Sequence, residues 1–353
     1  MGEYYENAHV VVAASGADNA TKGCFLPHPS LDEVTLPFDS GGSIAGSFKM
    51  TLRPPSHRVQ PRFSPLADRA WVCQEWWLSR RIVHFCKDSV MWSCTCSDNR
   101  FGLLQNGEAY DLVMYWDWML LVLSCSGRKL SHASDRLAAI QELANEFKKT
   151  RPDKYVMGLW SEDLPTALLW NGFDRTEELS KFPSWTWASV AGMFDPPFNY
   201  LSDMMDKCFE PEARILDIRD KCMQLNISGY MATGSFQQPD NETLEHPEDL
   251  VDRFGECLEN LSDNDGKHIG WAVLDGQDDL APDEQIPLLV IVKWLPGEDG
   301  PRILFYCCLL LEEVDPAERG ADGSNPTIPM FRRIGLGVIS KEARKELQEV
   351  DLI

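Results

Sequence analysis

The pattern of apolar positions in the first third of the chain predicts strands alternating with a helix. Residues 8–14 form a continuous apolar run, AHVVVAA, that ends at a Ser-Gly pair. Such a run is typical of a buried strand in a parallel sheet. Further along, Ser64 and Pro65 predict the start of a helix, because serine caps helices and proline suits the first helical position. Two short runs after this helix, 82–86 and 90–94, predict a β-hairpin.

The middle of the chain changes to helical spacing. Residues 110–124 form a tryptophan-rich stretch that predicts a helix, and Ser134 with Asp135 marks the start of a second. In this second helix the apolar residues fall on one face, as an amphipathic helix requires: Leu137, Ile140, Ala144 and Phe147. Edge strands are expected near residues 47–52, within a long segment rich in Gly, Pro and Ser.

From residue 214 onward the apolar runs are short and predict strands. They are 215–218, 223–227, 270–274, 288–294, 303–311 and 334–339. Ser340 then predicts the cap of a terminal helix over residues 341–350. The sequence therefore divides into three expected domains: 1–105, a helical Trp-rich extension at 106–192, and a β-rich region at 193–353.

Charge narrows the possible partners. The 353 residues carry 33 Lys and Arg against 55 Asp and Glu, a net charge of −22, and much of the excess predicts an acidic, solvated loop at 237–266. So acidic a chain repels phosphate backbones and anionic lipids, so neither nucleic acid nor membrane is an expected partner. No apolar stretch reaches the length of about 18 residues that a bilayer span needs. The start is not a secretory signal, which favours the cytoplasm and reduced thiols for the eleven cysteines.

No phosphate-binding loop, nucleophile elbow or zinc-protease motif is present. Cys94 and Cys96 could share a strand face and meet His84 and Cys86 across the hairpin, as a zinc site would require. Packing of small buried thiols is the favoured interpretation. We therefore expect neither a metal nor a cofactor.

Several strings resemble the heterokaryon-incompatibility (HET) domains of filamentous fungi. The most specific is PLADRAWVCQEWWLSRR at 65–81. It is similar to a block that closes the family's domain. The others are Met1–Ala8 with Gly23–Leu26, the hairpin strings HF at 84 and MWSC at 91, and a downstream series, SDRLAAI at 134, GLW at 158, LLW at 168 and PSWTWAS at 183.

The resemblance implies a fold and a function. The fold class it implies is α/β plus α+β: a partial TIR- or flavodoxin-like HET domain, a helical segment and a β-rich C-terminal region. The blocks that usually open the family's domain are not found, so a shortened and inactive relative is one alternative. The implied function is nonself recognition and regulated cell death through other proteins. A second alternative is a TIR-like enzyme that hydrolyses NAD or another small molecule, and a place in a secondary-metabolite pathway belongs to this alternative.

Glu75 is the catalytic candidate, because some TIR-like domains place a glutamate in a similar Trp- and Cys-containing helix. A carboxylate there could steady an oxocarbenium-like ribose or activate water. Trp71, Gln74 and Ser79 are the ligand-binding candidates on the same helix. The competing interpretation is structural: Glu75 would pair with a nearby arginine and anchor the helix. Structural roles are also expected for Arg136, Trp185 and Trp187.

Overall fold

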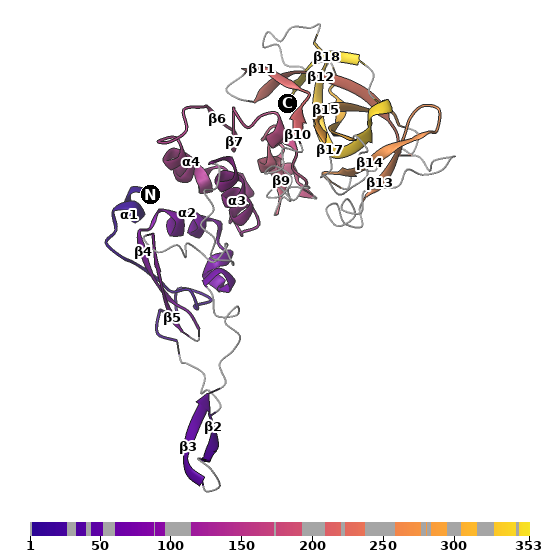
Figure 1. Cartoon of the computed structure of the whole chain (residues 1–353). Helices are drawn as coiled ribbons and strands as arrows, with labels where there is room; N and C mark the ends of the chain where they lie inside the picture. Colours follow the sequence, from indigo (N-terminus) through magenta and orange to yellow (C-terminus); the bar gives the residue numbers. More distant parts are fainter. Residues whose placement is uncertain are drawn as a thin grey trace. The chain divides into compact units, whose positions relative to one another are not determined.

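The computed structural model shows a mainly β protein (Figure 1). The described residues are 2–26, 33–39, 44–51, 61–87, 89–95, 114–172, 174–192, 209–219, 223–236, 258–276, 280, 284–294, 305–315, 328–343 and 346–353. Of the described residues, 44% lie in strands and 24% in helices. The expected TIR- or flavodoxin-like α/β fold is wrong, because a large mixed sheet dominates and most of its strands pair antiparallel.

Residue contacts divide the chain into two compact units. Unit 1 comprises Met1–Trp118, Arg128–Ser131 and Ala138–Glu146, and unit 2 comprises Met119–Gly127, His132–Leu137 and Phe147–Ile353. The described α-helices are α1 (Gly2–Asn7), α2 (Ala70–Leu78), α3 (Met114–Ser126) and α4 (Gln141–Phe147). Short 3₁₀ helices cover Pro61–Phe63, Pro65–Asp68, Ala133–Asp135, Ala138–Ile140, Thr166–Leu168, Glu177–Leu179, Trp187–Ser189 and Lys341–Ala343.

Unit 1 is built on a three-stranded sheet in the order β1-β4-β5. Its strands are β1 (Val11–Ala13), β4 (Arg81–Phe85) and β5 (Val90–Cys94). Strand β1 runs parallel to β4, and β4 and β5 form the expected antiparallel hairpin. One face packs with α2 in a small core of Ala13, Ala67, Val72, Trp76 and Ile82. The expectation that β1 is buried is wrong for Val12, which is 58% exposed.

The helix start at Ser64 is also misplaced. Pro65–Asp68 form a 3₁₀ turn, Ser64 makes no side-chain capping bond, and α2 begins only at Ala70 with Arg69 as its N-cap. The backbone N–H of Ala70 instead donates to the carbonyl of Lys129, 3.0 Å away, and the Lys129 N–H donates to Asp68. A bond from outside the helix thus satisfies one of its first donors, which no local signal predicts.

A second element of unit 1 is the hairpin of β2 (Glu33–Asp39) and β3 (Ile44–Thr51) (Figure 1). It contains the strand expected near residues 47–52. Its two faces differ in character: Thr35 pairs with Lys49 on one face, and Leu36 pairs with Phe48 on the other. Lys49 and Glu33 form an ion pair of 2.9 Å.

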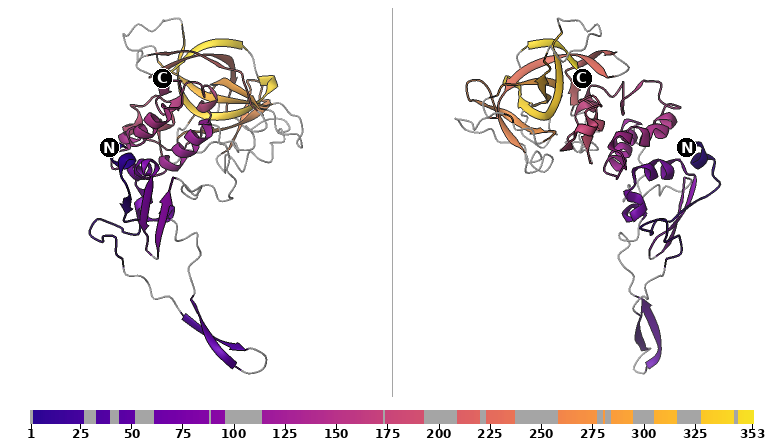
Figure 2. Two further views of the ribbon diagram at one scale, coloured as in Figure 1. Left: turned by 60° about the vertical axis from the view of Figure 1, so that its left-hand side comes forward. Right: turned by 180° about the vertical axis from the view of Figure 1, so that it is seen from behind.

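Unit 2 is organised around a sheet whose strands close on themselves (Figure 2). Hydrogen bonds join five strands in a ring, with β12 bonded to β15, β15 to β16, β16 to β17, β17 to β18 and β18 back to β12. The bounds are β12 (Gln224–Gly234), β15 (Ile286–Trp294), β16 (Phe305–Glu313), β17 (Met330–Ser340) and β18 (Glu346–Leu352). Closure removes the unpaired strand edges that otherwise invite aggregation.

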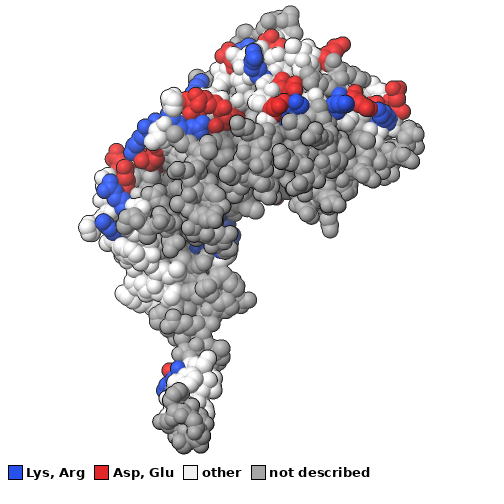
Figure 3. Space-filling view, in the orientation of Figure 1, with Lys and Arg blue, Asp and Glu red and all other residues white. Residues whose placement is uncertain are grey.

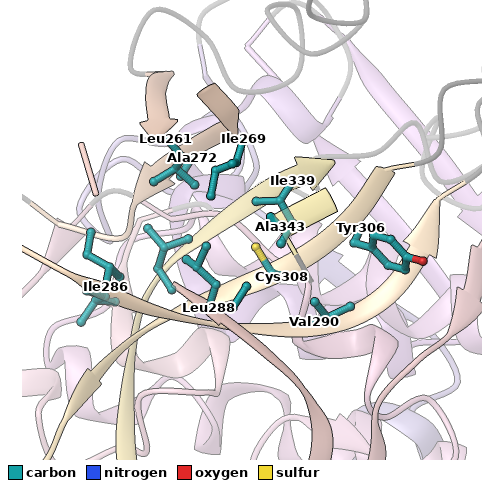
Figure 4. Close-up of a cluster of buried hydrophobic side chains, with 13 residues drawn as sticks. Leu261, Ile269, Ala272, Ile286, Leu288, Val290, Tyr306, Cys308, Ile339 and Ala343 are labelled. Carbon is teal, nitrogen blue, oxygen red and sulfur yellow. The ribbon is translucent and has the colours of Figure 1, made fainter. Parts of the chain in front are cut away.

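Further strands extend this sheet. They are β10 (Phe209–Pro211), β11 (Arg214–Arg219), β13 (Glu259–Ser262) and β14 (His268–Leu274). The buried interior is mainly apolar and includes Leu288, Val290, Cys308 and Ile339 (Figure 4). The six strands predicted from residue 215 onward are confirmed. Of the acidic loop, residues 237–257 lie outside the described part of the chain.

The expected terminal helix is wrong. Lys341–Ala343 form a 3₁₀ turn, residues 344–345 lie outside the described part of the chain, and residues 346–350 belong to strand β18, which pairs antiparallel with seven residues of β12. Glu, Leu, Lys and Gln favour helices in isolation. Here Val350 and Leu352 are fully buried in the sheet, so tertiary pairing overrides the local preference.

Four tryptophans form a second buried layer of unit 2. Trp160, Trp170, Trp185 and Trp187 are each at most 1% exposed. They lie in and between short strands: β6 (Tyr155–Val156), β7 (Leu159–Trp160), β8 (Asp174–Arg175) and β9 (Val190–Ala191). The indole N–H of Trp170 donates to the carbonyl of Trp185, 3.0 Å away, and that of Trp187 donates to Gly158, 3.1 Å away.

The structural role expected for Arg136 is confirmed. Its guanidinium donates to the carbonyls of Ser126 and Gly192, at 3.3 and 2.9 Å, and lies 5.3 Å from the centre of the Trp187 ring. Arg136 therefore connects the end of α3 to the segment that contains Trp187 and Gly192, through two backbone carbonyls and one ring contact.

A buried ionic cluster links the Trp layer to the closed sheet. Arg333 on β17 and Asp275 are both fully buried and form an ion pair of 2.9 Å. Arg333 also donates to the carbonyls of Leu168, at 2.7 Å, and Trp170, and its guanidinium stacks 3.4 Å from the Trp170 ring centre. Arg175 donates to the other oxygen of Asp275, 3.0 Å away. Each charge is thus paired and hydrogen-bonded, as burial requires.

The cysteines differ from the expectation of reduced thiols. Cys73 and Cys125 are disulfide-bonded, so that expectation is wrong for these two. Five other described thiols are outside disulfides, at positions 24, 86, 94, 307 and 308. Among the described residues, no helix is both long and apolar enough to cross a bilayer.

Candidate functional site

The candidate carboxylate, Glu75, lies in the middle of α2 and is half-buried. Its side chain shares a hydrogen bond with the hydroxyl of Tyr5 on α1, and Arg69 contributes an opposite charge nearby. The arginine expected by the structural interpretation is therefore present, but the direct partner is a tyrosine 70 residues earlier. We infer that Glu75 joins α1 to α2 inside unit 1.

The other candidates on α2 make contacts with the backbone. The amide oxygen of Gln74, which is buried, accepts from the backbone N–H of Glu142, 3.3 Å away. The Ser79 hydroxyl donates to the carbonyl of Glu75 at 2.6 Å. Trp71 is partly exposed, one helical turn before Glu75. Glu75, Gln74 and Ser79 thus meet on one helix as the sequence predicted, and their recorded bonds fasten that helix.

Burial shapes the acidity of this pair. Loss of solvent raises the pKa of Glu75 above its ordinary value, although the Tyr5 hydrogen bond and Arg69 oppose this. Burial also raises the pKa of Tyr5 to about 12, with the negative charge of Glu75 adding to the effect. Tyr5 therefore stays protonated at neutral pH and acts as the donor in the bond.

Replacing Glu75 tests this arrangement through pH. Because the folded state disfavours the ionised Glu75, its contribution to stability is largest below the ordinary pKa and is lost as pH rises through the raised pKa. We expect Glu75→Gln to flatten the dependence of the unfolding free energy on pH in that window, measured by urea denaturation. Glu75→Ala should cost about 1 kcal/mol through loss of the Tyr5 bond. An unchanged pH profile in Glu75→Gln would contradict the assignment.

A buried Ser–His pair was not found from the sequence. Ser15 Oγ and His84 Nδ1 share a hydrogen bond of 3.1 Å, and both residues are fully buried. Pairing of β1 with β4 aligns Ala13 with His84 and thereby brings Ser15 close. The Trp76 ring lies edge-on to the imidazole, with centroids 4.9 Å apart. The only sequence signal was the Ser-Gly pair at the strand end, since the partners are 69 positions apart.

The environment of His84 predicts a loss of stability in acid. Burial lowers its pKa from 6.5 to about 4, so the folded state holds the neutral ring. The contribution of the neutral His84 ring to the unfolding free energy is complete above the pKa that histidine has in the unfolded chain. It is lost as pH falls from 6.5 towards 4, by about 3 kcal/mol in total. We expect urea denaturation of His84→Asn, which keeps a polar atom towards Ser15, to show a weaker decline in that range. An equal decline in both proteins would exclude His84 as the cause.

The register of β4 and β5 argues against a zinc site across this hairpin. His84 lies opposite Met91, and Cys94 lies opposite Arg81, so His84 and Cys94 point to different faces of the sheet. Cys96 lies outside the described residues. Among the described residues, no group of three His, Cys, Asp or Glu side chains could hold a metal ion.

The charged surface is mixed in sign. Figure 3 shows Lys and Arg interspersed with Asp and Glu over the described residues of the face in view. Comparisons with family models, with curated proteins and with solved structures find no match for this chain.

Proposed function

We propose that this chain acts by binding other proteins in the cytoplasm, in nonself recognition and regulated cell death, as its resemblance to HET-domain proteins implies. The observation that supports a binding role over catalysis is that the candidate side chains make contacts within the fold. The side chains of Glu75, Gln74 and Ser79 hold α2 to α1, to the backbone of Glu142 and to α2 itself. Side chains that hold a helix in place in this way favour a role as a binding scaffold over a catalytic role.

One observation favours a second candidate, hydrolysis of NAD or another small substrate. The raised pKa of Glu75 and its partial exposure are properties of a general acid, since enzymes tune carboxyl groups upward by burial. A pKa raised by burial also occurs in carboxyl groups that only stabilise a fold, so it supports this candidate less strongly than the contacts support binding.

Expression of the full chain in a filamentous fungus tests the proposed role. We expect induced expression to arrest growth after fusion with at least one strain of different genotype, and not after self-fusion. Normal growth across a panel of such fusions would contradict the proposal.

Two substitutions of Glu75 separate the candidates. Glu75→Gln keeps an oxygen that can accept from Tyr5, so a binding protein should retain the growth phenotype. A hydrolase should lose the phenotype together with nicotinamide release from NAD, although Glu75→Gln remains folded. Glu75→Asp is the matched control, because it keeps the charge and shortens the side chain. Nicotinamide release by the purified chain that Glu75→Gln abolishes would establish the second candidate.

A further inference from the structure

The β2–β3 hairpin presents an apolar face to solvent. Val34 pairs with Met50 and Leu36 pairs with Phe48, so these four side chains form two adjacent rows on one side. Each is between 36% and 51% exposed. A two-stranded hairpin is at best marginally stable alone in water, so this apolar face indicates a surface against which the hairpin packs.

A second apolar surface lies on the three-stranded sheet of the same unit. The strand registers align Val12, Val83 and Trp92 in one row, and Phe85 and Val90 in the next. These residues project from the face opposite the core under α2, because side chains alternate along a strand. Val12, Trp92 and Val90 are 56–58% exposed. This sheet face therefore also has two apolar rows.

The chain that leads to the hairpin is already seated on this sheet face. The Phe25 ring packs edge-on against Phe85, with centroids 5.3 Å apart. Six residues, 27–32, separate Leu26 from the start of β2. Six residues reach roughly 20 Å when extended, twice the spacing of about 10 Å between packed sheets. The connection is thus long enough for the hairpin to fold back onto the face from which it leaves.

The size of the hairpin face argues against a second copy of the chain as its occupant. Four half-exposed side chains present on the order of 300 Å², well below the roughly 800 Å² per partner of a stable interface. A short connection within one chain supplies a millimolar effective concentration and removes most of that deficit.

We propose that the apolar face of the β2–β3 hairpin docks, within one chain, on the sheet face formed by Val12, Val83, Phe85, Val90 and Trp92. The two apolar layers pack face to face. The Lys49–Glu33 ion pair on the other side of the hairpin then faces water. This inference stands independently of the proposed function.

A photo-cross-link tests the contact in the full chain. p-Benzoylphenylalanine is placed at position 92 instead of Trp92, in an equal mixture of unlabelled and ¹⁵N-labelled protein, and cross-linked peptides are identified by mass spectrometry. We expect cross-links from position 92 to residues 33–51 in which the two joined peptides carry the same nitrogen isotope, because both come from one chain. Cross-links of mixed isotopes would assign the face to a second copy and overturn the proposal, and so would cross-links only to segments outside the hairpin.

Neighbouring residues on opposite hairpin faces give a matched control. Leu36→Asp places a carboxylate in the contact and should lower the cross-link yield by about tenfold or more. Thr35→Asp adds the same charge on the polar face, opposite Lys49, and should leave the yield unchanged. Equal yields in both variants would overturn the proposal, and hydrogen exchange at β2 and β3 checks that the hairpin still forms.

Discussion

Replacing Arg333 by methionine is expected to lower the unfolding free energy of unit 2 by about 3–5 kcal/mol, since removing one partner of a buried ion pair leaves the other charge with less compensation. The change removes the partner of Asp275 at 2.9 Å, the donor to Leu168 and Trp170, and the cation stacked on the Trp170 ring. Among the described residues, Arg175 is the ion-pair partner that Asp275 keeps. Urea denaturation followed by circular dichroism measures the loss.

Two further variants show whether the cost comes from the lost charge pair. Arg332→Met, at the preceding position of β17 and only partly buried, should cost under about 1 kcal/mol, because a charge that stays in contact with water contributes little to stability. Adding Asp275→Leu to Arg333→Met should recover part of the loss, because it removes a fully buried carboxylate that has lost one of its two cations. Additive losses in the double variant would show that packing dominates and not the charge.

Gly270→Ala is expected to destabilise the closed sheet by about 3 kcal/mol or more, because overpacking against backbone cannot be relieved by a rotamer change. A Cβ at Gly270 on β14 would lie 2.1 Å from the carbonyl oxygen of Val338 and 2.8 Å from Cα of Ile339 on β17. The two strands would have to separate locally. Hydrogen exchange at the amides of β14 and β17 should become faster together with the loss of stability.

Gly234 is the matched control in the same sheet. A Cβ there would lie 3.3 Å from the terminal methyl groups of Ile269 and Leu288, which are flexible side-chain ends. Gly234→Ala should therefore change the unfolding free energy by less than about 1 kcal/mol. Equal losses in the two variants would show that the close approach of β14 and β17 is not the cause.

The pattern of apolar residues predicted those elements whose own residues favour the conformation that they adopt. The β4–β5 hairpin and six strands of unit 2, namely β11, β12, β14, β15, β16 and β17, were predicted from runs of apolar and β-branched residues. Elements fixed by distant partners were missed. Strand β18 has helix-forming residues and becomes a strand only through β12, and α2 starts at Ala70 because Lys129 satisfies its N–H.

The candidate site shows the same division. Glu75, Gln74 and Ser79 were placed together because one helix carries all three. Tyr5, the direct partner of Glu75, and Ser15, the partner of His84, come from segments about 70 positions earlier. Only the packing of α1 and β1 brings these residues in. The expected fold class failed because it rested on a resemblance in short strings, which does not fix how the remaining strands pair.

The pairing of β12 with β18 has a consequence for synthesis. Leu225 lies opposite Leu352, so the ring of strands cannot close until more than a hundred residues after β12 have been made. Ribosomes add about 5–20 residues per second, so the edge of β12 that pairs with β18 stays open for several seconds at least on each nascent chain. A chaperone that binds extended apolar segments would then act mainly on β12, β15 and β16 during translation.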